Sequence, residues 1–494
     1  MQPAASARED FGNERATGHG ALIAVLVIVI AIAAFLYSHR LGDRALGAAE
    51  AYSAFAASQP SIAAILAIPV SEDPGKQVFY YATLHYWASI FGFGETALRS
   101  LSVLCALAAI LVLNGLGRTM FDARVGTAAA LIWAFNPLAV LSAHRARMYP
   151  MLAALALAHL LTLWQARRRG GYALATVSGV LGAAAIYTHL AAMTLIVVEA
   201  GMLARDLFEG RSRTPPHFPR LEPWIALAIS ILLLVPYLPV LTVQSHTLVS
   251  GHWLDWIGPA HEYPSVIRAI AVGMAGAIAA WFVFGSPLNG DDGDEPLRWA
   301  IAWSALPFVA FIAGSIAIRP ILHVRYLTPC LAMVSVVAAA TLGRINARAL
   351  RLGSFGWALL MLAIAVLVSP KPEPWREIAS IVASQSPQGA PIFFESGFVF
   401  EETPPVANDG FPRGYYRVPF DFYFKGTNTR LAVPAWDSSA ARETIAGAVR
   451  GAGGGWLITW KDRDAVRNEI PEVPGFHAVE KLRTADCALY RFEP

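Results

Sequence analysis

Long runs of apolar residues recur between residues 21 and 368, and short polar loops separate them. A helix needs about 20 apolar residues to cross the hydrocarbon layer, and shorter runs still span when flanking polar residues reach the interface. The pattern therefore predicts a mainly α, polytopic membrane protein of about eleven transmembrane helices. The expected spans are Ala21–Tyr37, Ala97–Leu116, Val125–Ser142, Met151–Gln165, Tyr172–Tyr187, Leu190–Leu207, Pro223–Val243, Val266–Phe284, Trp299–Ile318, Leu327–Leu342 and Phe355–Val368.

Arginines gather in every second connection between these spans. Because cytoplasmic loops carry an excess of Lys and Arg, these connections are expected in the cytoplasm. The N-terminal tail, residues 1–20, is then cytoplasmic, and the apolar run that follows it is an anchor rather than a cleavable signal. The loop of residues 38–96 and everything after residue 368 lie outside. The arginines are Arg118, Arg124, Arg167, Arg168, Arg169, Arg205, Arg211, Arg213, Arg220, Arg344, Arg348 and Arg351.

Two segments outside the spans have a pattern of their own. Gln77–Gly92 is short and rich in Tyr and Trp, which predicts a helix lying along the outer membrane surface. Residues 369–494 have the composition of a soluble domain and predict a small periplasmic α/β domain. Its expected helices are Trp375–Gln385 and Ala440–Arg450, and its expected strands are Pro391–Phe394, Leu431–Val433, Trp456–Trp460 and Ala488–Phe492.

Composition agrees with a membrane protein. Of the 494 residues, 56% are hydrophobic and 15% are charged, too few charges to cover a water-facing surface of this size. A net charge of +3 does not suggest a nucleic-acid partner. The three cysteines imply no disulfide framework.

Polar residues collect on the outer side of the predicted topology. Charges kept at that boundary are candidates for function. Arg and Lys match phosphate oxygens, and a carboxylate can take a proton from an attacking hydroxyl, so these residues suit a lipid-dependent sugar transferase. No histidine spacing indicates a metal site, and the need for a divalent metal stays open. The outer polar residues include Glu50, Asp73, Lys76, His144, Arg145, Arg147, Tyr149, Thr188, His189, His252, Asp255, His323, Arg325 and Tyr326.

Five segments in this order resemble motifs of the GT-C membrane glycosyltransferases. The most similar branch contains the protein mannosyltransferases, the aminoarabinose transferase and the rhizobial lipopolysaccharide galacturonosyl transferases. Its first outer loop reads W-x-D-E-A-Y-S, and its third motif reads S-Q-E-A-R-M-Y. The corresponding segments are Gly47–Ser53, Phe79–Arg99, Ala143–Tyr149, Tyr187–His189 and Arg325–Pro329.

The resemblance implies a GT-C-like transmembrane domain, residues 21–368, in a bacterial inner membrane. The implied activity moves a sugar from a polyprenyl-phosphate donor, itself a membrane lipid, to a lipid, glycan or protein acceptor on the periplasmic side. No cofactor is implied beyond this substrate. The residues expected to bind substrate or phosphate are Lys76, Tyr81, Arg147, Tyr149, His189, Arg325 and Tyr326.

Three polar motif positions are changed in this chain. Ala49 stands where the motif has the aspartate usually taken as the base, Arg145 replaces a glutamate, and Lys76 begins the segment that replaces H-P-P. Glu50 and Asp73 are therefore the expected catalytic carboxylates, although Asp73 also lies in a turn-forming sequence. Two alternatives stay open: a non-catalytic member that binds a lipid-linked sugar or supports a partner enzyme, and a transporter. Scarce charges inside the spans argue against the transporter.

Overall fold

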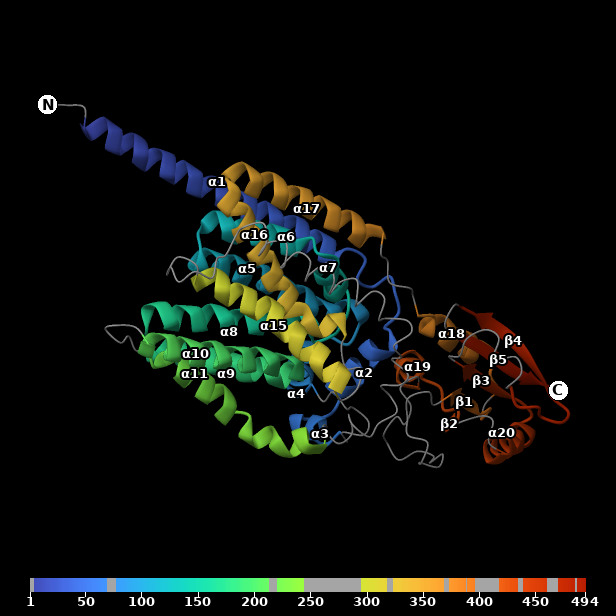
Figure 1. Ribbon diagram of the computed structural model, residues 1–494. Helices are drawn as coiled ribbons and strands as arrows, with labels where there is room; N and C mark the ends of the chain where they lie inside the picture. The colour runs from blue at the N-terminus through green and yellow to red at the C-terminus, as the bar shows by residue number, and fades with distance from the viewer. Residues whose placement is uncertain are drawn as a thin grey trace.

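The structure is a computed structural model of the chain. It describes residues 4–68, 77–212, 220–243, 295–317, 323–367, 373–387, 389–395, 417–433, 439–459, 470–484 and 487–494. Within these ranges the molecule is a bundle of helices with a small α/β unit at one end (Figure 1).

The bundle is built around α8, which packs against α5, α9, α11 and α16. Small residues allow the closest approaches: a Cβ atom on Gly126 of α6 would lie 2.5 Å from the Asn114 backbone oxygen of α5. The helices of the bundle are α1 (Ala4–Ser38), α5 (Glu95–Met120), α6 (Ala123–Ala134), α7 (Pro137–Ala143), α8 (Tyr149–Arg169), α9 (Tyr172–Thr188), α10 (Met193–Ser212), α11 (Glu222–Leu232), α15 (Glu295–Ala317), α16 (Thr328–Ile345) and α17 (Ala347–Leu367).

Every predicted span except one overlaps a described helix; Val266–Phe284 lies outside the described residues. Within the described part, 6 helices are long and apolar enough to cross a membrane, or up to 7 if α6 and α7, bent by 61°, form one broken span. Helix α9, with 17 residues, is a shorter apolar helix. The predicted number of eleven spans therefore stays a prediction.

Large apolar side chains cover the outer faces of several helices. On α1, Ile23 is 55% exposed and Phe35 64%; on α17, Phe355 is 58% exposed. Exposed apolar surface of this extent is typical of contact with lipid. The chain is thus a membrane protein with several apolar helices.

A buried polar pair lies inside the bundle, where sequence reasoning expected few charges. His159 of α8 and Glu199 of α10 are each 1% exposed, and His159 Nε2 lies 2.9 Å from both Glu199 carboxylate oxygens. The other ring nitrogen, Nδ1, lies 2.8 Å from the Ser178 backbone oxygen of α9. A buried ionisable pair needs such partners, and here it links α8, α9 and α10.

Three helices form the long segment between α1 and α5: α2 (Ala48–Ala57), α3 (Ile62–Ala67) and α4 (Val78–Phe91). The helix predicted at Gln77–Gly92 is therefore present as α4. One side of it is buried, with Tyr80, Tyr81 and Leu84 at 2% exposure or less, while Ile90 is 72% exposed. A helix with one buried and one exposed side agrees with an interfacial helix. Its position at the membrane surface stays a prediction.

The C-terminal part contains a five-stranded sheet with strand order β2-β1-β3-β5-β4. Strands β2, β1 and β3 run parallel, whereas β5 pairs antiparallel with β3 and β4. The predicted helices and strands are all present, but α19 and β4 were missed. The elements are α18 (Trp375–Gln385), β1 (Ile392–Glu395), α19 (Arg417–Tyr423), β2 (Arg430–Val433), α20 (Ser439–Ala452), β3 (Gly455–Thr459), β4 (His477–Arg483) and β5 (Ala488–Glu493).

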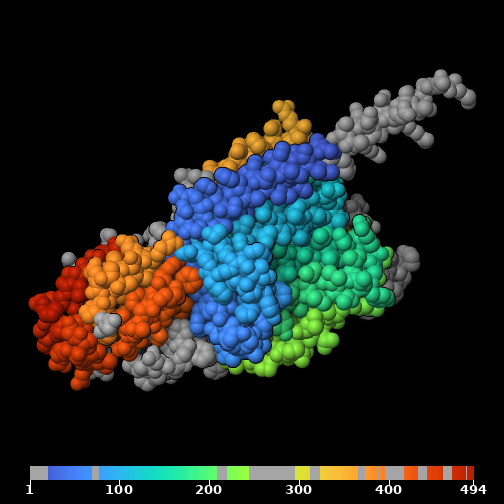
Figure 2. All heavy atoms as spheres, turned by 180° about the vertical axis from the view of Figure 1, so that it is seen from behind, coloured from blue at the N-terminus to red at the C-terminus, as the bar shows by residue number. Residues whose placement is uncertain are grey.

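This α/β unit contacts the segment before α5, as the space-filling view in Figure 2 shows from behind. The Tyr423 hydroxyl of α19 accepts a hydrogen bond from the Leu46 backbone N–H at 2.7 Å and donates to Glu95 Oε1 at 3.0 Å. Arg376 of α18 donates to the same Glu95 oxygen at 2.6 Å. These contacts hold the α/β unit against the end of the bundle where α5 and α8 begin.

Candidate functional site

An arginine-lined cavity of about 70 Å³ lies at this end of the bundle. Four segments far apart in sequence meet there: the turn before α2 with the first turn of α2, the start of α5, the turn between α7 and α8, and the short turn Val324–Leu327 before α16. A fifth contribution comes from the segment that leads into α18. The lining residues are Arg44, Ala45, Gly47, Ala49, Glu50, Arg99, His144, Arg145, Arg147, Tyr149, Arg325 and Glu373.

The first turn of α2 places Glu50 in the cavity wall. Gly47 precedes the helix in an extended conformation, and its N–H donates to Glu50 Oε2 at 3.0 Å, which satisfies one of the unpaired donors of a helix start. The other carboxylate oxygen, Oε1, accepts from the Ala146 backbone N–H at 2.8 Å. Glu50 therefore ties the start of α2 to the turn between α7 and α8.

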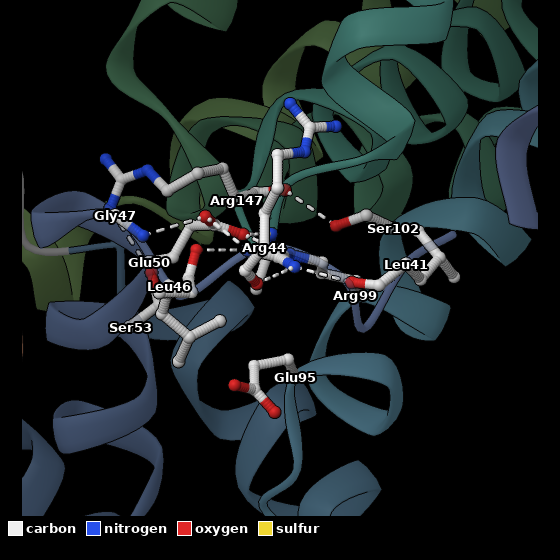
Figure 3. Close-up of polar contacts among 12 residues, drawn as sticks. Leu41, Arg44, Leu46, Gly47, Glu50, Ser53, Glu95, Arg99, Ser102 and Arg147 are labelled. Atoms are coloured by element: carbon white, nitrogen blue, oxygen red, sulfur yellow. Dashed lines mark hydrogen bonds and ion pairs between the residues drawn. The ribbon is translucent and has the colours of Figure 1, made fainter. Parts of the chain in front are cut away.

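Glu50 also forms a buried ion pair with Arg99 of α5 (Figure 3). Arg99 Nε donates to Oε1 at 2.8 Å and Nη2 to Oε2 at 2.9 Å, a two-point contact that suits a guanidinium and a carboxylate. The side chains of Arg99 and Glu50 are 4% and 8% exposed. Further Arg99 N–H groups donate to the backbone oxygens of Leu41, Arg44 and Ala45. The pair thus fixes the turn before α2.

Arg147 lies on the opposite side of Glu50 from Arg99 in Figure 3. Its Nη1 donates to the Ala49 backbone oxygen at 2.9 Å and to Ser53 Oγ at 3.2 Å. The Ser102 hydroxyl donates to the Arg147 backbone oxygen at 3.2 Å. The guanidinium is therefore oriented by α2, and its backbone by α5, at the edge of the cavity.

Aromatic rings surround the second predicted arginine, Arg325. Its guanidinium carbon lies 5.8 Å from the centre of the Tyr149 ring and 6.0 Å from that of Tyr326, within cation–π range. The His189 ring centre is 4.6 Å from Tyr326 and 6.0 Å from Tyr149. Burial, together with the charges of Arg147, Arg325 and His323, lowers the pKa of His189 to about 3, so its imidazole is neutral at physiological pH.

A carboxylate from the other end of the chain completes the cavity. Glu373 precedes α18, and its Oε2 accepts hydrogen bonds from the Ala48 backbone N–H at 2.8 Å and from Trp375 Nε1 at 2.9 Å. Burial raises the pKa of Glu373, and the negative charge of Glu50 adds to this effect. The segment that follows the last predicted span therefore contributes directly to the cavity.

Positive charge dominates the lining. Five arginines and two glutamates face the cavity, and one arginine is already paired with Glu50. Two of the remaining four, Arg147 and Arg325, lie beside hydrogen-bond acceptors or aromatic rings that orient them. Guanidinium groups in this arrangement suit an anion with several oxygens, such as a phosphate. Among the residues that the structure describes, no three His, Cys, Asp or Glu side chains gather in a way that could hold a metal ion.

The structure brings most of the predicted site residues together. Glu50, Arg147, Tyr149 and Arg325 line the cavity, and His189 and Tyr326 join it through their ring contacts. Tyr81 is buried in the apolar cluster that also holds Tyr149, outside the lining. Asp73 and Lys76 lie outside the described residues. The roles assigned to these residues stay predictions.

Sequence reasoning missed three lining residues as members of the site. Arg99 belongs to the segment Ala97-Leu98-Arg99, which resembles a family motif. The motif does not indicate that Arg99 contacts Glu50. Arg44 stands in the predicted first outer loop and belongs to no motif. Glu373 had no signal beyond being a carboxylate shortly after the last predicted span, since only the folded chain brings it to α2.

Comparison with known proteins agrees with this architecture. Residues 76–240 match the family model of dolichyl-phosphate-mannose-protein mannosyltransferases. A search of curated proteins finds no match. The fold is similar to that of ArnT from Cupriavidus metallidurans, solved with bound undecaprenyl phosphate, with a TM-score of 0.58 at 13% identity over 94% of this chain and 97% of that chain.

Two larger enzymes share the fold. The oligosaccharyltransferase AglB from Archaeoglobus fulgidus, solved with an inhibitory peptide and a dolichol-phosphate, gives a TM-score of 0.54 at 11% identity over 89% of this chain and 69% of that chain. The mycobacterial arabinofuranosyltransferase AftD gives 0.52 at 16% identity over 95% of this chain and 41% of that chain. The fold of the chain is thus similar to that of GT-C membrane glycosyltransferases, and residues 76–240 match the mannosyltransferase family model.

Proposed function

We propose that the protein moves a sugar from a polyprenyl-phosphate donor to a hydroxyl group of a lipid, glycan or protein acceptor. The observation that carries this proposal is the arginine-lined cavity at one end of an apolar helix bundle. A lipid phosphate places its charge at the membrane boundary and its chain in the bilayer. The cavity offers cations where the phosphate lies, and the exposed apolar helix faces offer contact with its chain.

Arg147 and Arg325 are the proposed phosphate ligands. Both line the cavity at ordered positions, and a guanidinium at a fixed position stabilises the charge that develops on a departing phosphate. Tyr149 lines the cavity beside them, and the rings of His189 and Tyr326 pack against it. Such rings suit contact with the face of a sugar ring. The ArnT structure with undecaprenyl phosphate supports this class of donor, because the two folds are similar along nearly their whole length.

Glu50 has a positioning role in this proposal. Its two oxygens together accept hydrogen bonds from Arg99, from the Gly47 N–H and from the Ala146 N–H. A carboxylate with all these donors has no oxygen turned only toward a substrate. Asp73 stays a candidate for the proton acceptor from sequence.

The proposed location is a bacterial inner membrane, with the cavity on the periplasmic side and the N-terminus in the cytoplasm. Support comes from the distribution of charge along α8. Its first residue, Tyr149, lines the cavity, whereas Arg167, Arg168 and Arg169 lie about 30 Å away at the other end. Those arginines mark the cytoplasmic end under the positive-inside rule.

Transfer is tested with the purified full-length protein in nanodiscs, supplied with polyprenyl-phosphate sugars and a mixture of hydroxyl acceptors. Release of the polyprenyl phosphate and appearance of the glycoside are measured together. We expect Arg147→Ala to lower kcat by about 10²–10³-fold, because one fixed donor to the leaving phosphate is lost. Arg118→Ala is the matched control, since Arg118 is exposed at the opposite end of α5. Equal turnover by wild type and Arg147→Ala would remove Arg147 from the mechanism.

A second candidate function is binding of a lipid-linked sugar without transfer. The observation behind it is Ala49, which lines the cavity at the motif position that otherwise carries an aspartate. A protein of this kind binds undecaprenyl phosphate with an affinity that falls in Arg147→Ala, yet releases no phosphate from any sugar donor. The binding and turnover assays together separate the two functions.

A further inference from the structure

Two carboxylates line the arginine-lined cavity, and only one of them has an oxygen available for new chemistry. Each Glu50 oxygen accepts two hydrogen bonds from protein donors. In Glu373 the hydrogen bonds from Ala48 N–H and Trp375 Nε1 both go to Oε2. Among the described residues, no donor contacts Oε1. Glu373 is therefore the carboxylate with one oxygen that accepts no hydrogen bond from the described residues.

A glycine lets Glu373 Oε1 lie close to the start of α2. A Cβ atom on Gly47 would lie 2.5 Å from Oε1, too close for either atom to stay in place. Gly47 has φ −69° and ψ 163°, a conformation that any residue adopts, so the backbone does not require glycine here. The absence of a side chain at position 47 therefore allows the Glu373 carboxylate to take up this position in the cavity wall.

The charges around Glu373 leave it able to accept a proton. Glu50 of α2 faces it and disfavours the ionised form, while Arg145, in the turn between α7 and α8, favours it. Burial outweighs Arg145 and the two hydrogen bonds, and the pKa of Glu373 is raised from its ordinary value of 4.5. A carboxylate with a raised pKa is a stronger base than an ordinary carboxylate.

We propose that Glu373 is the proton acceptor of the sugar-transfer reaction, acting through Oε1. This inference rests on the proposed function. The acceptor oxygen forms a bond to the anomeric carbon as the bond from that carbon to the phosphate oxygen breaks. The electron pair of the broken bond leaves on the polyprenyl phosphate, whose charge the arginines stabilise. The hydroxyl proton moves to Glu373 Oε1 and is then released to water.

One consequence concerns the assembly of the site. Glu373 lies two residues before Trp375, which begins α18 and is fully buried in the core of the α/β unit. Its position in the cavity therefore depends on how that unit docks on α2 and α5. The reacting groups then come from segments near both ends of the chain. The α/β unit would position the proton acceptor and also shape the site where the acceptor molecule binds.

Glu373→Gln is the discriminating variant. A glutamine keeps the size of the side chain, and its amide oxygen can accept the hydrogen bonds from Ala48 and Trp375, but its NH₂ group cannot take a proton. We expect kcat to fall by about 10²-fold or more, with the affinity for undecaprenyl phosphate within about threefold of wild type. Glu377→Gln, an exposed carboxylate on α18, is the matched control and retains wild-type kcat. Asp73→Asn is measured beside it as the rival acceptor.

The pH dependence of kcat gives a readout that a structural role would not change. Wild type is expected to lose activity as pH falls through the raised pKa of Glu373, because the protonated carboxyl cannot accept a proton. Glu373→Asp should keep this acid limb at reduced kcat, and Glu373→Gln should lose it.

The outcomes separate the two proposals. Active wild type with an equally active Glu373→Gln overturns the role of Glu373 and leaves the transferase function intact. Loss of kcat in Asp73→Asn, with Glu373→Gln unaffected, assigns the proton to Asp73 and overturns this proposal as well. Wild type that binds undecaprenyl phosphate but transfers no sugar from any donor overturns the proposed function, and the proton acceptor with it.

Discussion

The two walls of the cavity differ in how firmly they are held. The wall made by α2 and α5 centres on Glu50 and Arg99, whose buried contacts reach three segments of the chain. The wall made by the segment before α18 depends on Glu373 Oε2 and on partly exposed contacts to Glu95. A fully satisfied carboxylate builds structure, whereas a half-satisfied one keeps an oxygen for reaction. Position in a cavity therefore does not by itself assign a chemical role.

Among the variants that test this difference between the two walls, Arg99→Ala should lower the unfolding free energy most. It leaves Glu50 buried without its cation and removes three donors from the turn before α2. Breaking one partner out of a buried pair costs about 3–5 kcal/mol of unfolding free energy. The loss is measured by denaturant titration in mixed micelles, with Arg118→Ala at the exposed end of α5 as control. A change under about 1 kcal/mol would show that the first wall is not held by this pair.

Hydrophobic pattern was enough to locate the helices of the bundle, because spans of lipid-facing helix leave a long apolar signal. The positions of the arginine-rich loops alone predict that the N-terminal ends of α5, α8 and α16 lie on the same side of the membrane. The strands of the α/β unit followed from short apolar runs between turn residues. In contrast, α19 contains a proline and two aromatic residues beside Asp421. Strand β4 lies at the edge of the sheet, and its sequence lacks a regular alternation of apolar and polar residues. Neither element therefore has a strong local pattern.

The site shows where sequence reasoning ends. Motifs pointed to Arg147, Tyr149 and Arg325, and the fold brings these together. The same reasoning could not tell that Glu50 is enclosed by donors, because Arg99 and Ala146 are 49 and 96 residues away along the chain. It could not find Glu373, which lies 325 residues from its partner Ala48. Pairings over such distances depend on packing that no local pattern records.

Gly47→Ala sharpens the comparison at the point where the two walls meet. The new methyl group would displace Glu373 Oε1, the far end of a flexible side chain, so the cost in stability should be about 1 kcal/mol or less. Activity is expected to fall more, by about tenfold or beyond, because small displacements of a reacting group are costly. The same substitution in a Glu373→Gln background should have little further effect on kcat. Gly447→Ala, where a Cβ meets open space, is the control.

If Gly47→Ala retains wild-type kcat, the position of Glu373 Oε1 does not matter for turnover. If it instead lowers stability as much as Arg99→Ala, the second wall is as rigid as the first, and the contrast between the two carboxylates disappears.

Glu95→Ala should have the smallest effect, and it tests how the second wall is attached. The substitution removes the contacts with Arg376 and Tyr423, but the Tyr423 hydroxyl still accepts from Leu46 N–H and Glu373 still accepts from Ala48 N–H. Arg376 is half exposed, and an ion pair of this kind contributes about 0–1 kcal/mol. Hydrogen exchange in α18 and α19 is expected to rise slightly, with kcat within about threefold of wild type. Glu95→Ala leaves the Arg99–Glu50 ion pair in place. If this variant nevertheless loses as much activity as Glu373→Gln, the contacts of Glu95 position the proton acceptor, and the hydrogen bond from Ala48 of α2 does not.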